Sequence, residues 1–270
     1  MRVRSTLRHG PVEGYQFGYS PVRFVKPIPV WCYFLHDTLI DTGSRHCQRE
    51  VLETFAQKPI RQVLLTHFHE DHSANAHALR QQHNCPVRAG VLTTQRIGQA
   101  FPLMAYERFW FGSIDPCPGA EVIPDRIDVG PYTLQTLPTL GHSDDHHVFY
   151  EADEGWLFAG DFYIGNLKIF RRGENIRHMI ESTRAILKLD FDTVFCGHNP
   201  VLKGGKAAVA RKLQYLEDIV GNVLAGYERG LRGSALLEAA RLREQWPIRL
   251  LTQHDVGADR IVESVLANYA

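Results

Sequence analysis

The sequence predicts an α/β (α+β) fold that ends in a helical C-terminal region. Short apolar runs alternate with helical patterns as far as about residue 200, which is typical of sheets flanked by helices. Several of these runs end in Asp, His or Gly, and loops at strand ends are where sites are usually built. Beyond residue 202 only helical periodicity remains. We therefore expect a core over residues 1–202 and a helical appendage over residues 203–270.

The strands and helices of the core are assigned from apolar periodicity. Apolar runs predict strands at residues 30–40, 62–66, 132–138, 147–151, 156–159 and 193–196. Apolar residues at helical spacing predict helices at residues 45–57, 72–83 and 175–188. Four strands lead directly into residues able to bind a metal or a substrate, namely Asp41, His67, Asp161 and His198.

The appendage is expected to begin with one long helix. Apolar residues recur at spacings of 4, 3, 4, 3 and 4 from Val209 to Tyr227, which predicts an amphipathic helix of about 24 residues, or roughly 36 Å. Its apolar stripe can pack on the chain's own core, cover the functional site or form a homodimer face. Two shorter helices are expected at residues 234–244 and 258–268.

The composition argues against several classes of protein. The chain has 270 residues with 30 basic and 30 acidic side chains, a balance that disfavours general nucleic-acid binding. The longest apolar run, residues 30–35, is far too short to span a membrane, and no signal peptide is apparent. Five scattered cysteines without a CxxC pair indicate a reducing compartment, so we expect a cytoplasmic protein.

The most informative segment is THFHEDH at residues 66–72. Three imidazoles and two carboxylates follow a buried type of strand, and both groups are ligands for zinc and similar divalent metals. His67 and His69 can face one ion, and Asp71 and His72 can face a second. Asp71 could instead be only the N-cap of the helix that follows, but that role leaves three histidines unexplained.

One segment cannot close a metal site, so further ligands must come from elsewhere in the chain. Candidates follow three other apolar runs, at residues 141–146 (GHSDDH), 160–161 (GD) and 197–200 (GHNP). A glycine in each segment lets the backbone turn tightly beside a ligand.

Taken in order, these motifs resemble the metallo-β-lactamase-fold hydrolase superfamily, in particular its glyoxalase II and lactonase-like branch. The resemblance covers about residues 25–202 and implies a four-layer αββα sandwich. Many β-lactamases of this superfamily carry cysteine or serine where this chain has Asp161, so antibiotic hydrolysis is not expected. The C-terminal basic residues with which glyoxalase II binds glutathione are not matched here.

The resemblance also implies which side chains hold metal. They form two groups of three with a bridging aspartate: His67, His69 and His142; Asp71, His72 and His198; and Asp161 between them. Asp41, in an Asp-Thr-Gly turn, matches a residue that orients ligands without binding metal. His146 is a further candidate for such a supporting role.

This ligand set implies a dinuclear metal-dependent hydrolase. Two divalent ions about 3.5–4 Å apart share a bridging hydroxide in such sites, which supplies a nucleophile at neutral pH. We expect hydrolysis of a thioester, ester or lactone, with zinc as the leading metal and iron or manganese also compatible. The candidate catalytic residues are Asp71, Asp41 and Tyr163. Tyr163 would contact the substrate or developing charge, and simple packing is its alternative role.

Two other functions stay open at this stage. A phosphodiesterase or nuclease of the same fold would need a basic groove near the metals. A regulatory or binding protein would keep the metals with little turnover. A persulfide-oxidising iron enzyme fits less well, because that branch uses one iron and needs no complete second group of ligands.

The substrate is expected to be a small molecule with an apolar or acyl group. The aromatic segment at residues 101–112, which includes Phe109, is either satellite core or an apolar wall beside the metals. Lys168, Arg171 and Arg172 either receive an anionic substrate tail or form a solvated basic face.

Overall fold

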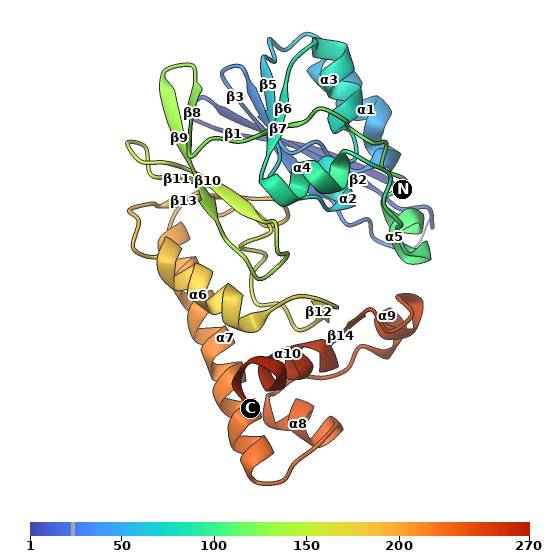
Figure 1. Ribbon diagram of the computed structural model, residues 1–270, viewed down its shortest axis with the longest axis vertical. Coiled ribbons are helices and arrows are strands. Elements are labelled where there is room, and N and C mark those ends of the chain that lie inside the picture. Colours follow the sequence, from blue (N-terminus) through green and yellow to red (C-terminus); the bar gives the residue numbers. More distant parts are fainter. Residues whose placement is uncertain (23–24) are drawn as a thin grey trace.

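Two β-sheets packed face to face form the centre of the computed structural model, which describes residues 1–22 and 25–270 (Figure 1). Over these residues the first sheet contains, in spatial order, β1 (Arg2–His9), β2 (Val12–Tyr19), β3 (Val30–Leu35), β4 (Thr38–Ile40), β5 (Gln62–Leu64), β6 (Val87–Ala89) and β7 (Glu121–Val122). The second sheet contains β13 (Thr193–Cys196), β11 (Trp156–Gly160), β10 (His147–Glu151), β9 (Tyr132–Pro138) and β8 (Arg126–Val129). A separate pair joins β12 (Phe170–Arg171) to β14 (Val256–Gly257).

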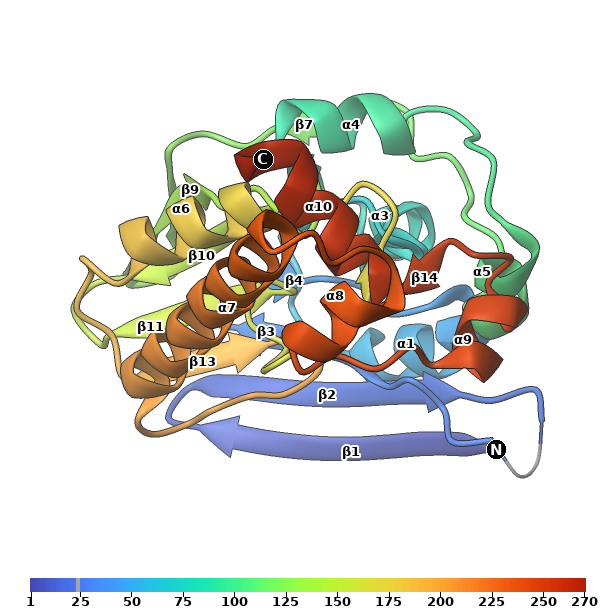
Figure 2. The ribbon, with the colours of Figure 1, turned by 90° about the horizontal axis from the view of Figure 1, so that it is seen from below.

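Helices cover the outer face of each sheet (Figures 1 and 2). Those of the core are η1 (Arg45–Cys47), α1 (Gln48–Phe55), α2 (Glu70–Ser73), α3 (Ala76–His83), α4 (Val91–Ile97), α5 (Ala105–Trp110) and α6 (Ile176–Ile186). Helices α1 and α3 share an apolar cluster with the first sheet, and α6 shares one with the second sheet and α7 (Gly205–Glu228). The predicted four-layer αββα sandwich is therefore confirmed.

The core between the sheets is built from aliphatic and aromatic side chains. Ile40 and Leu64 of the first sheet share a buried cluster with Phe158 and Phe195 of the second. The rings of Phe158 and Phe195 stack with their centroids 4.8 Å apart. Burying each such side chain stabilises the fold by about 1.5–3 kcal/mol, so this interior holds the strand ends in fixed positions.

Strand direction brings the polar strand ends together. β4 runs parallel to β5 in the first sheet, and β11 runs parallel to β13 in the second. The carboxyl ends of parallel neighbours meet at the same edge of a sheet. Asp41 follows β4, segment 66–72 follows β5, Asp161 follows β11 and His198 follows β13, so a single edge of the sandwich collects them.

Most predicted elements lie close to their expected positions, with two corrections. The strands at 132–138, 147–151 and 193–196 coincide with β9, β10 and β13. The strand expected over residues 30–40 is instead a hairpin of β3 and β4, because His36 turns the chain with a positive φ of 55°.

The second correction concerns the helix expected over residues 72–83, which is two helices. The helix is interrupted between α2 and α3. At this interruption the side-chain amide of Asn75 donates to the backbone carbonyls of Thr42, Gly43 and Ser44. These three bonds tie the break to the Asp-Thr-Gly turn after β4. The interruption therefore anchors the metal-binding segment to its neighbouring strand end.

Several elements of the core were not expected from the sequence. They include the β1–β2 hairpin, the short strands β6, β7 and β8, and the helices α4 and α5. β1 is mostly exposed at a sheet edge and carries Arg2, Arg4 and Arg8, so it lacks the apolar signal of an interior strand. The short strands have only two to four residues each, too few to show periodicity.

Residues 203–270 are largely helical, as expected. They form α7, α8 (Ser234–Ala239), α9 (Trp246–Leu251) and α10 (Asp259–Tyr269), of which α9 was not predicted. The apolar stripe of α7 packs within the chain: Val209 lies over the second sheet, while Leu216 and Val223 pack with α6 and α10. The division of the chain into two domains at residue 202 stays a prediction.

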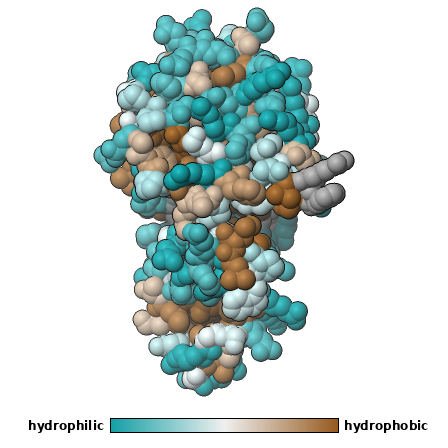
Figure 3. All heavy atoms as spheres, turned by 90° about the vertical axis from the view of Figure 1, so that its right-hand side faces the viewer, coloured by the Kyte–Doolittle hydropathy of each residue, from teal (hydrophilic) through white to brown (hydrophobic). Residues whose placement is uncertain are grey.

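One face of the molecule exposes apolar side chains on α5 and α9, and this face is seen in Figure 3. Phe109 of α5 and Trp246, Leu250 and Leu251 of α9 are among the exposed large apolar residues of the described chain. Of the helices within residues 1–22 and 25–270, none has the length and apolar character that a membrane span requires. All five cysteines are buried and free, with no disulfide in the described part of the chain.

Candidate metal centre

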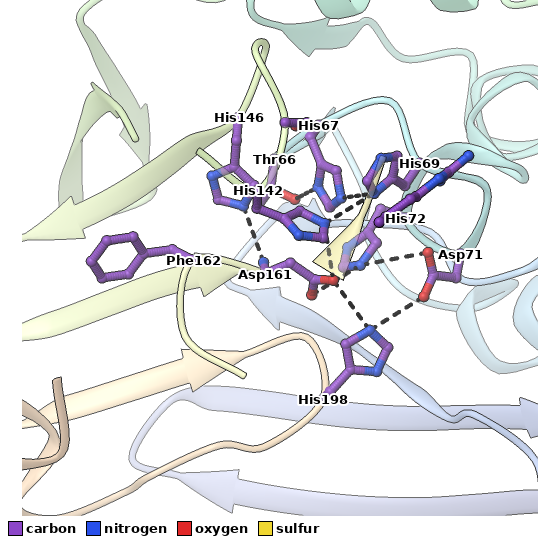
Figure 4. Close-up of polar contacts among 12 residues, drawn as sticks. Thr66, His67, His69, Asp71, His72, His142, His146, Asp161, Phe162 and His198 are labelled. Atoms are coloured by element: carbon purple, nitrogen blue, oxygen red, sulfur yellow. Dashed lines mark hydrogen bonds and ion pairs between the residues drawn. The ribbon is translucent and has the colours of Figure 1, made fainter. Parts of the chain in front are cut away.

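Five histidines and two aspartates converge at the shared strand edge (Figure 4). They are the seven residues expected from the sequence: His67, His69, Asp71, His72, His142, Asp161 and His198. Their inward-facing nitrogen and oxygen atoms fall into three overlapping groups, and within each group the atoms lie within 4.8 Å of one another. The structure therefore brings together all seven side chains that the motifs identified as candidate metal ligands.

The first group is His67, His69 and His142. Nδ1 of His69 lies 2.9 Å from Nε2 of His67 and 3.0 Å from Nε2 of His142. Two nitrogens bound to one tetrahedral zinc ion at 2.0–2.1 Å are roughly 3.3 Å apart, so three such nitrogens suit one ion. Burial, together with neighbouring histidines, lowers the pKa of His67 and His69 well below the usual range, which keeps their lone pairs free.

The second group is Asp71, His72 and His198. Nε2 of His198 lies 3.3 Å from Oδ2 of Asp71, and Nε2 of His72 lies 3.8 Å from Oδ1 of the same carboxylate. Although burial opposes protonation, nearby carboxylates raise the pKa of His72 and His198 well above the usual value, with Asp161 the strongest of them. A bound cation would displace these protons, as metal binding generally does.

Asp161 lies between the two groups. Its Oδ1 is 3.3 Å from Nε2 of His72, and its Oδ2 is 3.4 Å from Nε2 of both His142 and His198. Burial opposes ionisation, but His198 and His72 hold the pKa of Asp161 well below its usual range. An ionised carboxylate that reaches histidines of both groups is suited to bridge two cations.

Outward-facing partners fix the orientation of the histidines. Nδ1 of His72 lies 2.8 Å from the Asp41 carboxylate, and Nδ1 of His198 donates to the Pro29 carbonyl at 2.8 Å. Asp41 also accepts from the backbone N–H of Thr66 at 2.9 Å. A partner on the outer nitrogen sets the tautomer and leaves the inner nitrogen as a ligand. Asp41 therefore contacts His72 on the side away from the centre, and its role in orienting a ligand stays a prediction.

The donors present fit divalent cations. Nε2 of His72 and Oδ1 of Asp161 are buried and make no hydrogen bond among the described residues. A buried polar atom without a partner costs about 1–3 kcal/mol, more when it is charged. A cation between these atoms would remove that cost, and imidazole with carboxylate is the donor set of zinc, iron and manganese sites.

Two glycines allow the close approach of the strand ends. A Cβ on Gly160, whose φ is +44°, would lie 2.6 Å from Thr66 Oγ1, and a Cβ on Gly197 would lie 2.7 Å from the His72 ring. Any larger residue at either position would displace the motif residues. The glycines that precede Asp161 and His198 are therefore required by packing at the site.

The sequence nominated His146 as a supporting residue and missed Glu174. The backbone N–H of Asp161 donates to Nε2 of buried His146 at 3.0 Å, which fixes the start of the loop after β11. Oε1 of Glu174 lies 2.6 Å from Nδ1 of His142. No motif includes Glu174. In the sequence it stands just before a helix and so resembles a solvent-exposed capping residue, although in the structure it is buried.

Tyr163 is not among the residues that converge at the centre. It is buried with Phe162 in the apolar cluster over the second sheet. It is absent from the described residues that line the cavity beside the metal centre. Its expected contact with the substrate stays a prediction, and its surroundings are those of a packing residue.

A cavity of about 440 Å³ opens beside the first group. His69 and His142 form its inner wall, and Phe68 and Phe101 form an apolar side, with their ring centroids 5.5 Å apart. Phe109, by contrast, is exposed and lies away from this cavity. Segment 101–112 thus contributes Phe101 to the lining of this cavity.

The arginines near the cavity are mostly paired with carboxylates. Arg96 binds Asp144 through two nitrogens and lies 4.6 Å from the Phe68 ring centroid. Arg171 contacts Glu107 and lies 3.3 Å from Asp255. The positive charges of Arg96 and Arg171 are therefore largely neutralised by neighbouring carboxylates.

A two-sheet sandwich with a histidine and aspartate cluster at its strand ends defines a metal-binding αββα protein. Residues 25–198 match the pattern of the metallo-beta-lactamase superfamily, and the chain belongs to this superfamily. The expectation drawn from the motifs is confirmed.

The curated relatives share this part of the chain. Hydroxyacylglutathione hydrolases of Cereibacter sphaeroides and Legionella pneumophila are 30% and 29% identical to it over 172 and 160 residues. Each match covers 56% of this chain, and 60% and 53% of those two proteins respectively. The chain thus spans little more than half the length of these relatives.

Solved structures share the fold at lower identity. A beta-lactamase domain protein from Burkholderia ambifaria has a TM-score of 0.63 at 19% identity, covering 81% of this chain and 77% of that one. A metallo-beta-lactamase family protein from Thermus thermophilus has a TM-score of 0.63 at 18% identity, covering 94% of this chain and 91% of that one. These likenesses establish the fold of most of the chain.

Proposed function

We propose that this protein is a hydrolase that uses two divalent metal ions, with zinc the first choice, to cleave a thioester, ester or lactone. The observation that carries the proposal is the arrangement of the seven side chains, in which Asp161 lies beside histidines of both groups of three. The first ion would be held by His67, His69 and His142, the second by Asp71, His72 and His198, and Asp161 would bridge them.

Bound divalent ions would supply a water of lowered pKa and would polarise the substrate carbonyl. The chain's own residues perform the positioning. Asp41 orients the His72 ring through its contact with Nδ1. The backbone N–H of Asp161 donates to the His146 ring, and this bond helps to position the Asp161 carboxylate. Asp71 would bind the second metal ion, and this is the part in catalysis that is proposed for it.

The cavity supports a small substrate with an apolar acyl group. Phe68 and Phe101 offer an aromatic surface directly beside His69 and His142, so an acyl chain lying on it would bring its carbonyl to the centre. The curated relatives are named as hydrolases of hydroxyacylglutathione, which supports a thioester as the first substrate class to test.

The cavity is less suited to the alternatives. A phosphodiester would call for unpaired cations. Arg96 and Arg171 are bound to Asp144 and Glu107, which leaves the largely exposed Arg172 among the described arginines that line this cavity. A binding protein whose metal site is covered by the chain would lack an open route to the centre. This cavity, by contrast, reaches His69 and His142.

The test is metal analysis and turnover on one sample. We expect about two metal ions per purified chain, and hydrolysis of acyl thioesters or esters in preference to bis(p-nitrophenyl) phosphate. Asp161→Ala should lose both bound metal and hydrolysis. Asp218→Ala, at an exposed position on α7, is the matched control and should retain both.

Purified protein without stoichiometric metal would contradict the proposed centre. Metal-loaded protein that is inert on esters, thioesters and lactones would contradict the hydrolase and favour a binding role.

A further inference from the structure

Glu174 is a buried acid that the proposed chemistry does not use directly. It lies in the turn between β12 and α6, and its side chain is only 5% exposed. One carboxylate oxygen lies 2.6 Å from Nδ1 of His142, and the other accepts the backbone N–H of Arg171 at 2.7 Å. The carboxylate is thus fixed on one side by its own turn while the other side meets a histidine of the metal centre.

Glu174 is not needed to cap the helix that follows it. The side chain of Asn175 accepts the backbone N–H of His178 at 3.1 Å and so caps the N-terminus of α6. Since the neighbouring residue performs this task, the local role of the Glu174 carboxylate is limited to the one oxygen that accepts the Arg171 N–H. Its other oxygen is directed at His142, a contact that helix capping does not explain.

The C-terminal appendage holds Glu174 in place. Oγ of Ser264, on α10, donates to the Glu174 carbonyl at 3.1 Å and accepts the backbone N–H of Ile176 at 2.9 Å. A single hydroxyl, 90 residues away in sequence, therefore fastens the turn on both sides of Asn175. The contact is buried, so water does not compete for it.

A second set of contacts fastens the start of the same turn. β12 pairs with β14, and the backbone N–H of Arg172 donates to the Asp255 carbonyl at 2.9 Å. The side chain of Arg171 lies 3.3 Å from the carboxylate of the same aspartate. Residues 170–176 are therefore bound to the appendage at their beginning, through Asp255, and at their end, through Ser264.

We propose that Glu174 is a positioning residue for His142, and that residues 255–264 of the appendage hold Glu174 in place and so support the metal centre without contacting it. A carboxylate on the outer nitrogen of a metal-binding histidine fixes its tautomer and ring orientation and makes the inner nitrogen a better donor. Here that carboxylate depends on a helix that supplies no ligand. This inference rests on the proposed metal centre but not on hydrolysis.

The test compares metal affinity in matched variants. Glu174→Ala removes the carboxylate, Glu174→Gln keeps an oxygen for His142 but loses the charge, and Ser264→Ala removes only the anchor in the appendage. Tyr215→Phe is the control, because its hydroxyl also joins the appendage to the core, at the Leu167 carbonyl, without touching a candidate ligand. Each protein is titrated with Zn²⁺ against a chelator and with Co²⁺ for its visible spectrum.

We expect Glu174→Ala to weaken binding of one of the two ions about 10–100-fold and to change the Co²⁺ spectrum. Glu174→Gln and Ser264→Ala should weaken it in the same direction by less, while Tyr215→Phe matches the wild type. Circular dichroism checks that each variant is folded, and if Glu174→Ala does not fold, the other two variants decide.

Wild-type affinity and an unchanged Co²⁺ spectrum in all folded variants would overturn the inference, even if the protein is an active hydrolase. A metal-loaded wild type without hydrolysis would overturn the proposed function and leave this affinity test valid.

Discussion

Lys212 is a positively charged side chain that the fold buries beside the metal centre, and it makes stability depend on pH. It lies on α7, and its Nζ donates to the carbonyl of Phe162, the residue after Asp161. Burial lowers the pKa of Lys212 from 10.5 to about 8, although Cys196, Glu174 and Asp161 act to raise it.

The sign of the effect follows from proton binding. Between about pH 8 and pH 10.5 the unfolded chain holds a proton on this lysine that the folded chain has lost, so the free energy of unfolding rises with pH in that window. A pKa difference of about 2.5 corresponds to a penalty of about 3 kcal/mol on the folded state at pH 7. Of this penalty, about 2 kcal/mol is relieved by pH 9.5.

The perturbation is Lys212→Met, which keeps an unbranched side chain and removes the charge. We expect the free energy of unfolding of wild type, relative to the variant, to increase by about 2 kcal/mol from pH 7 to pH 9.5. The assay is urea unfolding followed by circular dichroism at several pH values, with equal metal content in both proteins. Lys206→Met is the control, since Lys206 also donates to a carbonyl from α7 but is partly exposed.

Parallel stability curves for wild type and Lys212→Met across this range would refute the reasoning. They would mean that the folded protein holds the Lys212 proton as tightly as the unfolded chain does. A matching slope in Lys206→Met would also refute it, because the effect would then not depend on burial.

Three other perturbations test the site and its surroundings. Phe101→Ala should raise KM for an aromatic acyl thioester roughly tenfold with little change in melting temperature, as steady-state kinetics and thermal unfolding would show. Asp41→Asn should weaken metal binding about 10–100-fold in a chelator competition, because His72 loses its anionic partner. Arg171→Met should lower the free energy of unfolding by about 3–5 kcal/mol in urea, since it leaves Glu107 and other acids buried without a cation. Exposed Arg172→Met should not.

The interior of the fold could be predicted because its sequence signal is local. β11 and β13 are continuous apolar runs buried on both faces, and their ends carry Asp161 and His198. The outer elements could not be predicted in the same way. β1 gains its place by pairing along its whole length with β2, a contact that depends on the partner strand and not on its own composition.

Turns without glycine or proline account for the errors in the core. The turn between β3 and β4 uses His36 and Asp37, and nothing in the apolar run around them signals a reversal. The break before α3 depends on three bonds from Asn75 to a turn more than thirty residues earlier. At this break, tertiary contacts decide a backbone conformation for which local propensity gives no preference.

Glu174 shows why the donors of the centre could be found from sequence while part of their support could not. A metal ligand here must be a histidine or a carboxylate in a segment that follows a strand. Its residue type and its position are therefore visible together in a short motif. A residue that orients a donor needs only to reach the outer face of the ring. Asp41 could be predicted because it also ends a strand, whereas Glu174 reaches His142 across 32 residues and depends on Ser264, 90 residues further on. Substitutions in α10 are therefore expected to act on metal affinity although no residue of this helix contacts the centre, and sequence motifs alone would class them as remote.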